Sequence, residues 1–507
     1  MNSYFTTKRL ILVVIGIGSL MWYFLSLPGQ LFSSPYCTVL EDRSGQLLSA
    51  SIASDGQWRF PETGVVNDKF VKSITAYEDK RFWNHPGVDV LALGRAIRKN
   101  IQAGRVVSGG STLTMQMIRL SRQNPDRTIF QKIIEVILAT RAELRYSKKE
   151  ILNLYASHAP FGGNVVGIEA ACWRYFGRSS QELSWGEATL LAVLPNNPSL
   201  IHLARNRDQL MSKRNRLLKK LFDQGELDEV SYQLAIAEPI PEKPQPLPRL
   251  APHLLDRAAQ DGYGQHVIHS SIDGSLQVRT EQVVDDHYQR LKGNQVFNAA
   301  VLILDVKTGE ALAYVGNSKA GAAHEENVDV IRSPRSTGSI LKPFLFAAML
   351  DEGKILPRTL MPDVPTLIGG FAPKNFSRQY DGAVPADNAL LRSLNIPTVY
   401  ELIDYRYEKF YNLLQRIGMT TLSQPPDHYG LSLVLGGAEG TLWDITGMYA
   451  SAARTLNNYF ERAGSNRYDK KDFHPPHFSA GVVVRCFFNG VQFIFECFFC
   501  LAHLRNP

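Results

Sequence analysis

Six prolines lie within one short segment near the middle of the chain, PIPEKPQPLPRLAP from Pro239 to Pro252. Proline fixes the backbone φ angle and has no amide hydrogen, so such a segment cannot continue a helix and favours an extended polyproline geometry. The segment therefore predicts a linker, and we expect the 507-residue chain to fold as separate units on either side of it.

The residues before the linker carry a helical pattern. Phe70, Val71, Ile74 and Tyr77 recur at helical spacing, and Asn67 or Asp68 is placed to cap this helix. Three further apolar-periodic runs follow the capping-box patterns Thr128-x-x-Gln131, Ser147-x-x-Glu150 and Ser184-x-x-Glu187. We therefore expect a compact, mostly α-helical domain, preceded at residues 36–60 by short strands around a turn.

The residues after the linker carry a mixed pattern. Ala300–Val306 and Ala311–Val315 predict two strands around a turn, and helical stretches alternate with loops from about Leu341 to Thr455. This favours an α/β domain, a mixed sheet with helices. From residue 457 the chain becomes rich in Phe and Cys and predicts no clear element, so we expect an aberrant or divergent tail.

The N-terminus predicts a membrane anchor. Lys8 and Arg9 precede an uncharged run of 18 residues from Leu10 to Leu27, which reaches the roughly 17–25 residues that span a bilayer as a helix. Basic residues before the run favour a cytoplasmic N-terminus. No A-x-A-like cleavage site follows, so we expect an uncleaved signal anchor with the rest of the chain outside the cytoplasm.

These patterns predict six segments. They are a cytoplasmic tip and transmembrane anchor (1–30), a strand-rich connector (31–56), the helical domain (57–238), the linker (239–252), the partial α/β domain (253–456) and the divergent tail (457–507).

Composition excludes little. The formal net charge of +7 is compatible with a nucleic acid, an anionic lipid, a phosphorylated substrate or simply a solvated basic surface. The five cysteines have neither zinc-ligand spacing nor the density of a disulfide framework.

Two carboxylates and a basic stretch in the helical domain point to chemistry. Glu78 opens the segment EDKRFWNHPGVD, although an isolated E-D-K-R cluster is more often a surface ion-pair group. Residues 119–149 hold eight basic and three acidic side chains, and Lys132 and Glu135 are three apart, on one helix face. Such an arrangement suits transfer from a sugar pyrophosphate, because the cations hold the diphosphate and a carboxylate deprotonates the attacking hydroxyl.

Four motifs together resemble a known family. EDKRFWNHPGVD, GGSTLTMQ, Lys132-x-x-Glu135 and SKKEILNLYASHAPFGGNVVGIEAA occur in the order and spacing of glycosyltransferase family 51. This is the polymerase domain of class A, bifunctional penicillin-binding proteins, and HAPFGGN resembles their 1C-like members most. The resemblance covers about residues 57–235. One departure is Tyr155-Ala156-Ser157, where the family commonly has Y-x-N.

The resemblance implies a lysozyme-like, mostly α fold that polymerises lipid II with inversion and releases undecaprenyl pyrophosphate. Glu78 matches the family's general base, and Glu135 matches a second carboxylate that acts at the pyrophosphate, often with a divalent cation (Mg²⁺ or Mn²⁺). No organic cofactor is implied. The positions that match phosphate- and sugar-binding residues are Ser111, Gln116, Arg119, Arg127 and Lys132.

The same resemblance implies a location and partners. We expect a single-pass protein of the bacterial inner membrane with its catalytic domains on the periplasmic side. The expected partners are lipid II, the nascent glycan strand and other cell-wall synthesis proteins, and no nucleic acid.

The α/β domain resembles the penicillin-binding transpeptidases only in part. Ser339-x-x-Lys342 and Ser393-x-Asn395 match two of their motifs, which implies a nucleophile, its base, a proton relay and a substrate-amide contact in that order. The third motif, K-[ST]-G, does not follow. Lys307–Gly309 has the letters but precedes Ser339 and predicts a turn. We therefore expect an incomplete domain with lost or impaired D-Ala-D-Ala transpeptidase activity.

Two other functions remain open from the residues. A lysozyme-like glycan hydrolase also uses carboxylates on an α-helical fold, although it has no pyrophosphate to neutralise. A non-catalytic wall-binding membrane protein would need neither Glu78 nor Glu135.

Overall fold

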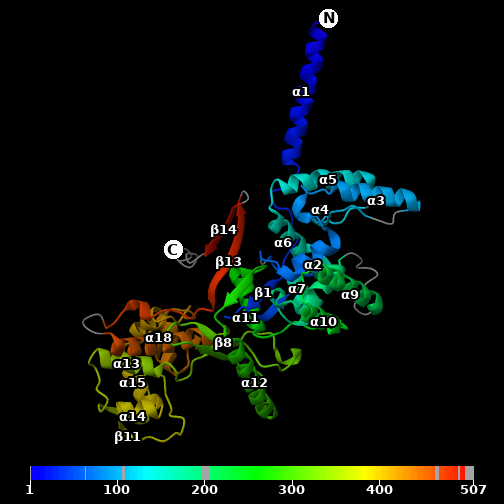
Figure 1. Cartoon of the computed structure of the whole chain (residues 1–507). Helices are drawn as coiled ribbons and strands as arrows, with labels where there is room; N and C mark the ends of the chain where they lie inside the picture. Colours follow the sequence, from blue (N-terminus) through cyan, green and yellow to red (C-terminus); the bar gives the residue numbers. More distant parts are fainter. Residues whose placement is uncertain are drawn as a thin grey trace.

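The computed structural model describes residues 2–62, 64–105, 109–126, 128–195, 206–462, 467–488 and 491–496, and side chains within residues 14–478 of these. A helix, α1 (Asn2–Leu25), stands above a helical domain, and a second, mixed domain follows below it (Figure 1). Among the side chains described, no helix is both long and apolar enough to span a bilayer. The predicted anchor begins at Leu10, outside the residues whose side chains are described, and stays a prediction.

The helical domain confirms the pattern read from residues 67–238. Its helices are α2 (Asp68–Glu78), α3 (Val90–Ala103), α4 (Leu113–Ser121), α5 (Ile129–Glu143), α6 (Lys148–His158), α7 (Ile168–Phe176), α8 (Trp185–Val193), α9 (Arg207–Asp223) and α10 (Glu229–Ala237). A small sheet joins β3 (Trp58–Arg59), β5 (Val165–Val166) and β4 (Pro160–Gly162).

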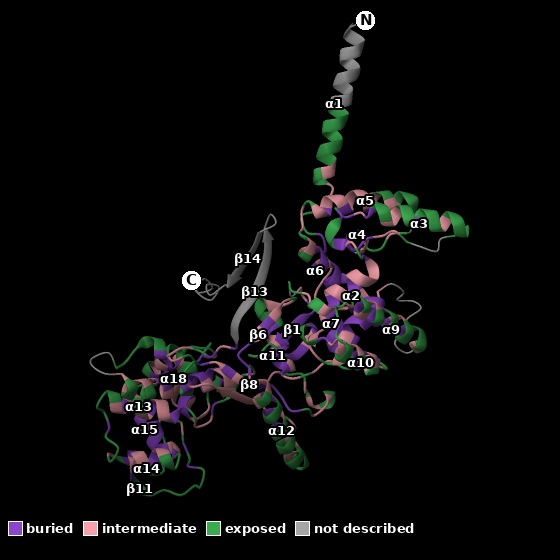
Figure 2. Cartoon of the chain, in the orientation of Figure 1, coloured by how far each residue is buried: buried purple, intermediate pink, exposed green. Residues whose placement is uncertain are grey.

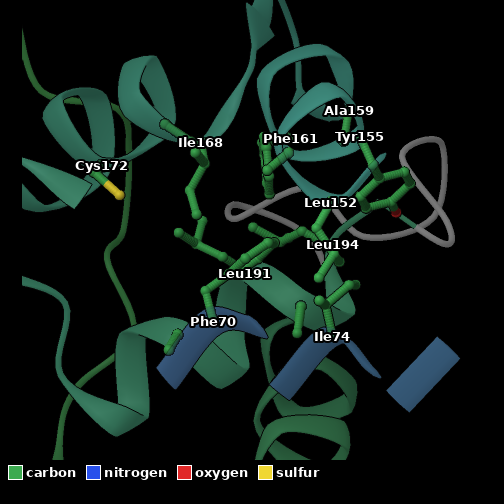
Figure 3. Close-up of a cluster of buried hydrophobic side chains, with 14 of the residues drawn as sticks. Phe70, Ile74, Leu152, Tyr155, Ala159, Phe161, Ile168, Cys172, Leu191 and Leu194 are labelled. Carbon is green, nitrogen blue, oxygen red and sulfur yellow. The ribbon is translucent and has the colours of Figure 1, made fainter. Parts of the chain in front are cut away.

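The core of this domain surrounds α8. Every residue of α8 from Gly186 to Val193 is buried, and all of them except Glu187 and Thr189 are apolar or glycine. Phe70 and Ile74 of α2 lie against Leu191 and Leu194 at α8 (Figure 3). This packing fixes α2, and therefore the residue at its C-terminal end, Glu78.

The predicted caps are confirmed with one exception. Asn67 caps α2, and complete capping boxes form at Ser147 and Ser184. At Thr128 the hydroxyl accepts from Gln131 N, but the reciprocal bond is missing. The amide of Thr128 donates instead to the carbonyl of Asp126, 2.8 Å away, which leaves no donor for the Gln131 side chain.

The linker has no helix from Pro239 to Ala251, and α11 (Pro252–Ala258) begins at its last proline. The connector before the helical domain pairs with a strand that follows the linker. A five-stranded sheet has the order β14 (Val491–Glu496), β13 (Ser479–Phe488), β6 (Val267–Ser270), β1 (Thr38–Glu41), β2 (Leu47–Ser51), with β1 and β6 parallel. Chain segments on both sides of the helical domain therefore form one platform beside it (Figure 1).

The second domain is mixed, as predicted. Its elements are α12 (Gly274–Leu291), β7 (Val301–Leu304), β8 (Ala311–Val315), β9 (Arg335–Ser336), α13 (Lys342–Asp351), β10 (Leu360–Asp363), β11 (Gly382–Pro385), α14 (Ala386–Leu391), α15 (Asn395–Tyr405), α16 (Tyr407–Arg416), α17 (Pro426–Tyr429), β12 (Glu439–Gly440) and α18 (Leu442–Glu461). Lys307–Gly309 lies in the turn between β7 and β8, where Thr308 N donates to Asp305 Oδ1. Buried side chains of α13, α15 and α16 form one core cluster. Figure 2 shows buried residues around α15.

The pattern change at residue 457 does not coincide with the end of an element, because α18 continues to Glu461. Arg462 then pairs with the buried Asp472, and the Arg454 guanidinium donates to the Asp472 carbonyl at 2.7 Å. The first part of the tail is therefore folded against α18. The predicted tail residues 497–507 lie outside the described part of the chain.

Candidate active site

Glu78 is the last residue of α2, and its side chain is partly buried. Gln116 Nε2, from α4, donates to Glu78 Oε2 at 2.9 Å. Burial raises the pKa of the Glu78 carboxyl, and the Gln116 hydrogen bond and the Arg119 charge lower it only in part. A carboxyl with a raised pKa is suited to accept a proton near neutral pH.

Glu135 lies on α5 and is 5% exposed. Arg119 Nε is 3.1 Å from Glu135 Oε1, and Lys132 Nζ is 3.0 Å from Glu135 Oε2. Lys132 Nζ also donates to the hydroxyl of Ser111. The structure thus brings the predicted residues Ser111, Arg119 and Lys132 together around the buried Glu135 carboxylate.

Arg119 connects the two carboxylates. Gln116 and Arg119 are three residues apart on α4 and therefore share a face. From this face Gln116 reaches Glu78, and the Arg119 guanidinium pairs with Glu135 while its charge acts on Glu78. The two acids belong to one electrostatic cluster. Arg127, also predicted to bind substrate, lies outside the described residues.

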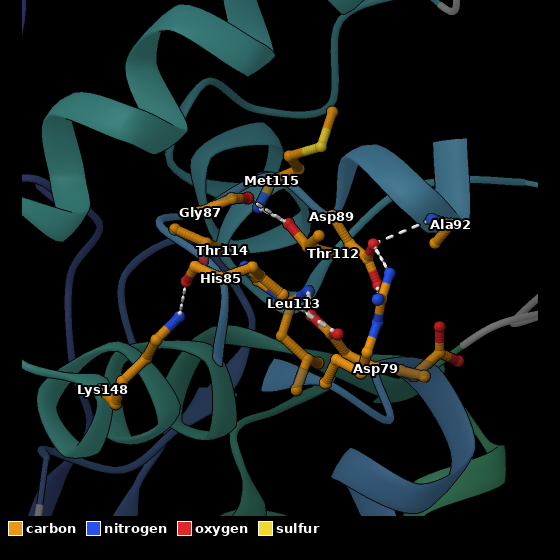
Figure 4. Close-up of polar contacts among 12 residues, drawn as sticks. Asp79, His85, Gly87, Asp89, Ala92, Thr112, Leu113, Thr114, Met115 and Lys148 are labelled. Carbon is orange, nitrogen blue, oxygen red and sulfur yellow. Dashed lines mark hydrogen bonds and ion pairs between the residues drawn. The ribbon is translucent and has the colours of Figure 1, made fainter. Parts of the chain in front are cut away.

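A network of buried polar contacts sets the position of α4 beside Glu78 (Figure 4). Asp79, 5% exposed, accepts from His85 Nε2 at 2.9 Å and from the backbone amide of Leu113 at 3.1 Å. Thr112 caps α4 and donates its hydroxyl to the carbonyl of Gly87. Within EDKRFWNHPGVD, Glu78 therefore contacts Gln116 in the cluster around Glu135. Asp79 instead joins the end of α2 to the start of α4.

Gly87 is required by its surroundings. Its φ is +88°, and a Cβ atom there would lie 2.7 Å from the carbonyl oxygen of Ala139 in α5. The segment that follows Glu78 therefore lies directly against α5, the helix that carries Lys132 and Glu135.

Sequence reasoning missed Tyr155, which lies on α6 and is 1% exposed. Burial raises its pKa, the charge of Glu78 raises it further and that of Arg119 lowers it, so the phenol lies near both groups. The motif run that contains Tyr155 is visible in the sequence, but its proximity to Glu78 depends on the packing of α6.

The residues around Glu135 do not fit a resident divalent cation. Mg²⁺ and Mn²⁺ prefer several oxygen ligands, whereas both Glu135 oxygens face cationic side chains. Among the described residues no group of three potential ligands gathers anywhere.

A second cluster forms in the mixed domain. Lys342, 1% exposed, donates from Nζ to Asn395 Oδ1 at 2.7 Å and to the carbonyls of Ser393 and Leu394 at 2.9 and 3.1 Å. The hydroxyl of Ser393 is 3.4 Å from the same nitrogen. Three of the four predicted residues therefore meet.

Ser339 is placed differently from the expectation. It lies in a turn, and α13 begins only at Lys342. Lys342 N donates to the carbonyl of Ser339, but no side-chain bond joins the two residues in the described structure. The physical reason is that the carbonyls of Ser393 and Leu394, with Asn395, already satisfy the ammonium.

Buried groups surround Lys342. Burial lowers the pKa of the Lys342 ammonium to about 8 and raises the pKa of Glu401, on α15, to about 7, and each charge counteracts the other's shift. Asn375 supports the S-x-N segment, since its Oδ1 accepts from Asn395 N at 2.9 Å and its Nδ2 donates to the fully buried Asp363. Sequence reasoning identified neither Glu401 nor Asn375.

Two family models match the chain. Residues 46–222 match the model described as transglycosylase, and residues 299–455 match that of the penicillin-binding protein transpeptidase domain. The chain is 37% identical to penicillin-binding protein 1C of Escherichia coli strain K12, over 79% of this chain and 52% of that protein. It is 30% identical to penicillin-binding protein 1F of Bacillus subtilis strain 168, over 73% and 52%.

The chain spans about half the length of these curated relatives. A crystal structure of penicillin-binding protein 1A from Haemophilus influenzae is 16% identical with a TM-score of 0.44, covering 89% of this chain and 70% of that one.

Proposed function

This chain belongs to the class A penicillin-binding proteins, and from that membership we propose that its helical domain is a peptidoglycan glycosyltransferase that polymerises lipid II. The observation that carries the proposal is the cluster in which one face of α4 presents Gln116 to Glu78 and Arg119 to Glu135. A proton acceptor and a cationic site for a departing diphosphate are then adjacent.

The cluster supports a direct displacement. The acceptor sugar hydroxyl attacks the anomeric carbon of the donor, and its proton passes to Glu78. The bond from that carbon to the diphosphate breaks, the electron pair leaves with the diphosphate, and the configuration inverts. Arg119 and Lys132 stabilise the developing negative charge, and Glu135 holds both cations in place.

Replacing the proposed base tests this function. With Glu78→Gln we expect polymerisation to fall about 10²–10⁴-fold while lipid II still binds, because the amide cannot accept the proton. Glu182→Gln, at an exposed position, is the matched control. The assay separates glycan polymer and undecaprenyl pyrophosphate from shortened glycan.

Each alternative has its own outcome in this assay. Shortened glycan would identify a hydrolase. Unchanged polymerisation by Glu78→Gln would refute the role of Glu78, and binding without any product from the unsubstituted chain would identify a wall-binding protein.

We propose that α1 anchors the chain once in the inner membrane with the catalytic domains outside the cytoplasm. In support, the side chains of α1 from Val14 onward are largely exposed and apolar. Arg145 of the segment after α5 donates to the carbonyl of Pro28, and Arg141 to that of Phe24, so the helical domain sits against the base of α1. Cysteine labelling of both termini in intact cells and in lysed cells tests the topology.

We propose that the mixed domain of this chain has lost or impaired transpeptidase activity. In support, the Lys342 ammonium donates to Asn395 Oδ1 and to the carbonyls of Ser393 and Leu394, and among the described residues no side-chain bond joins it to Ser339. Incubation with a labelled penicillin is expected to give little covalent product. Stoichiometric labelling that disappears in Ser339→Ala would refute this.

A further inference from the structure

A cavity of about 270 Å³ lies in the mixed domain, and none of its lining residues belongs to either cluster described above. Its walls come from α11, from α12 and from β8 with the loop that follows, and both helices pack on β8 (Figure 1). The volume is close to the lower limit for small-molecule sites, about 300 Å³. The cavity therefore has room for a short ligand and not for a glycan strand.

Hydrogen bonds hold the walls of this cavity together. Gln277 of α12, which is fully buried, donates to the carbonyl of Tyr314 at 3.0 Å and accepts from the amide of Tyr314 at 2.8 Å. Glu281, one turn further along α12, accepts from Ala251 N at 3.1 Å, so the end of the linker is held at the same wall. The cavity is thus formed before a ligand enters, which reduces the free energy that binding must spend on ordering.

Carboxylates outnumber cations around the cavity. The charged lining residues are four acids and two bases, Asp256, Glu281, Asp285, Glu326, Arg249 and Lys319. Lys319 Nζ pairs with Glu281 Oε2 at 2.9 Å, whereas the other three acids form no ion pair in the described part of the chain. The lining is therefore acidic, and it favours a positively charged ligand.

A buried imidazole lines the same cavity. His253 of α11 is 8% exposed, and its Nε2 lies 2.8 Å from the carbonyl oxygen of Glu326. A carbonyl only accepts, so Nε2 carries a proton and Nδ1 of the neutral ring is an acceptor. Among the described residues Nδ1 has no hydrogen-bond partner, and it lies beside Gly316, another wall residue, where a Cβ atom would come within 2.8 Å of it. A buried acceptor without a donor points to a ligand that carries N–H groups.

An ammonium fits these acceptors better than a metal ion does. In the part of the chain that the structure describes, no three side chains of the kind that bind metals gather at one point. The carboxylates therefore surround the cavity instead of converging on one ion. The lining is also partly apolar, through Val284, Tyr314 and Val315. A short alkyl chain that ends in an ammonium matches both features.

We propose that this cavity binds an aliphatic primary ammonium group, with Asp256, Asp285 and His253 Nδ1 as its acceptors. The alkyl chain of the ligand packs on Val284. Because Pro252 of the linker also lines the cavity, a bound ligand contacts the linker and the mixed domain together. Two sources carry this group, a small free amine and the side-chain amine of a peptide.

Titration of the full chain with n-pentylamine and with n-pentanol, followed by NMR, tests the proposal. The two ligands have the same carbon chain, but only the amine is charged at pH 7. We expect pentanol to bind at least about tenfold more weakly than the amine, and Asp256→Asn with Asp285→Asn to weaken amine binding about tenfold. Asp286→Asn, exposed on the same helix and outside the cavity lining, is the matched control.

Both substituted acids are exposed, so the variant is expected to fold, and thermal unfolding verifies this. A dipeptide with a free lysine side chain, and the same dipeptide with that amine acetylated, distinguish the two sources. If the free dipeptide binds at least as tightly as pentylamine and the acetylated one does not bind, the cavity takes a peptide side chain. If only pentylamine binds, it takes a free amine. Either result supports the ammonium site.

Three results would overturn the proposal. Equal binding of pentylamine and pentanol would mean that the cavity recognises only the alkyl chain. Binding of neither ligand would mean that its acids are simply solvated. An equal loss with Asp286→Asn would mean that the amine is attracted to the acidic surface of α12 and not to the cavity. Because no turnover is measured, these results are independent of whether the chain polymerises lipid II.

Discussion

Burial raises the pKa of Glu78, so at neutral pH the folded protein holds a carboxylate that would be better solvated in the unfolded chain. A group whose pKa is raised by folding contributes stability below its unfolded value, about 4.3, and this contribution is lost as pH rises through the folded pKa. Glu78→Gln is therefore expected to raise the melting temperature at pH 7.5 and to leave it unchanged near pH 3.5. Thermal unfolding at both pH values measures this. A lower melting temperature at pH 7.5 would show that Glu78 is stabilising where it stands.

Arg119 is expected to set the working pH of Glu78. Its charge lowers the pKa of the Glu78 carboxyl, so Arg119→Gln should move the acid limb of the kcat/KM profile to higher pH. It should also reduce the plateau about a hundredfold, because the proposed site for the leaving diphosphate loses a positive charge. Arg95→Gln, exposed on α3, serves as the control. An acid limb that stays in place would mean that the titrating base is not Glu78.

At the scale of elements, one buried acid joins the start of α4 to the end of α2. Asp79→Ala removes the acceptor for His85 Nε2 and for the amide of Leu113. We expect a loss of about 2–3 kcal/mol in stability, because both donors are left buried without partners. Activity should fall as well, although Asp79 does not face the cluster. Asp68→Ala, whose partner Lys72 is partly exposed, should cost less than about 0.5 kcal/mol. Urea unfolding of both variants gives the comparison.

The elements show which features a sequence can reveal. Helical spacing was sufficient to predict the Lys132–Glu135 pair and the capping boxes at Ser147 and Ser184, since each depends on residues within one turn. The capping box at Thr128 does not form, because the amide of Thr128 donates to the carbonyl of Asp126, a residue outside the pattern. Contacts between distant segments left no local signal. Asp79 with Leu113 spans 34 residues, and Lys220 with Ala76 spans 144.

The same distinction applies to the second cluster. The motif pattern singled out Lys342, Ser393 and Asn395, which the structure brings together. It did not show that α13 begins at Lys342 and leaves Ser339 in the preceding turn, because S-x-x-K fixes the order of residues and not the backbone between them. Asn375 and Glu401 carry no motif at all, and only their burial beside Asn395 and Lys342 identifies them.

At the scale of the whole molecule, the connector before the helical domain belongs to two cores. One side contributes to the helical domain through Leu31, Phe32, Cys37, Val39, Leu47 and Ala53. Leu40 and Leu48, which alternate with Val39 and Leu47 along the strands, pack instead with Ile268 and Tyr314 of the following domain. A connector that appears separate in the sequence is thus a shared layer, which explains why β1 pairs with β6 across the linker.

This shared layer predicts where the chain can be divided. A fragment of residues 57–238 follows the boundaries that the sequence suggests, but it lacks Leu27, Leu31, Phe32 and Val39, each at most 8% exposed in the intact chain. Losing the burial of several large apolar side chains, at about 1.5–3 kcal/mol each, approaches the whole stability of a domain, about 5–15 kcal/mol. We expect this fragment to be unfolded or molten, and residues 26–250 to fold. Near-UV circular dichroism and thermal unfolding distinguish them, and equal, cooperative transitions would show that the connector contributes nothing to the helical core.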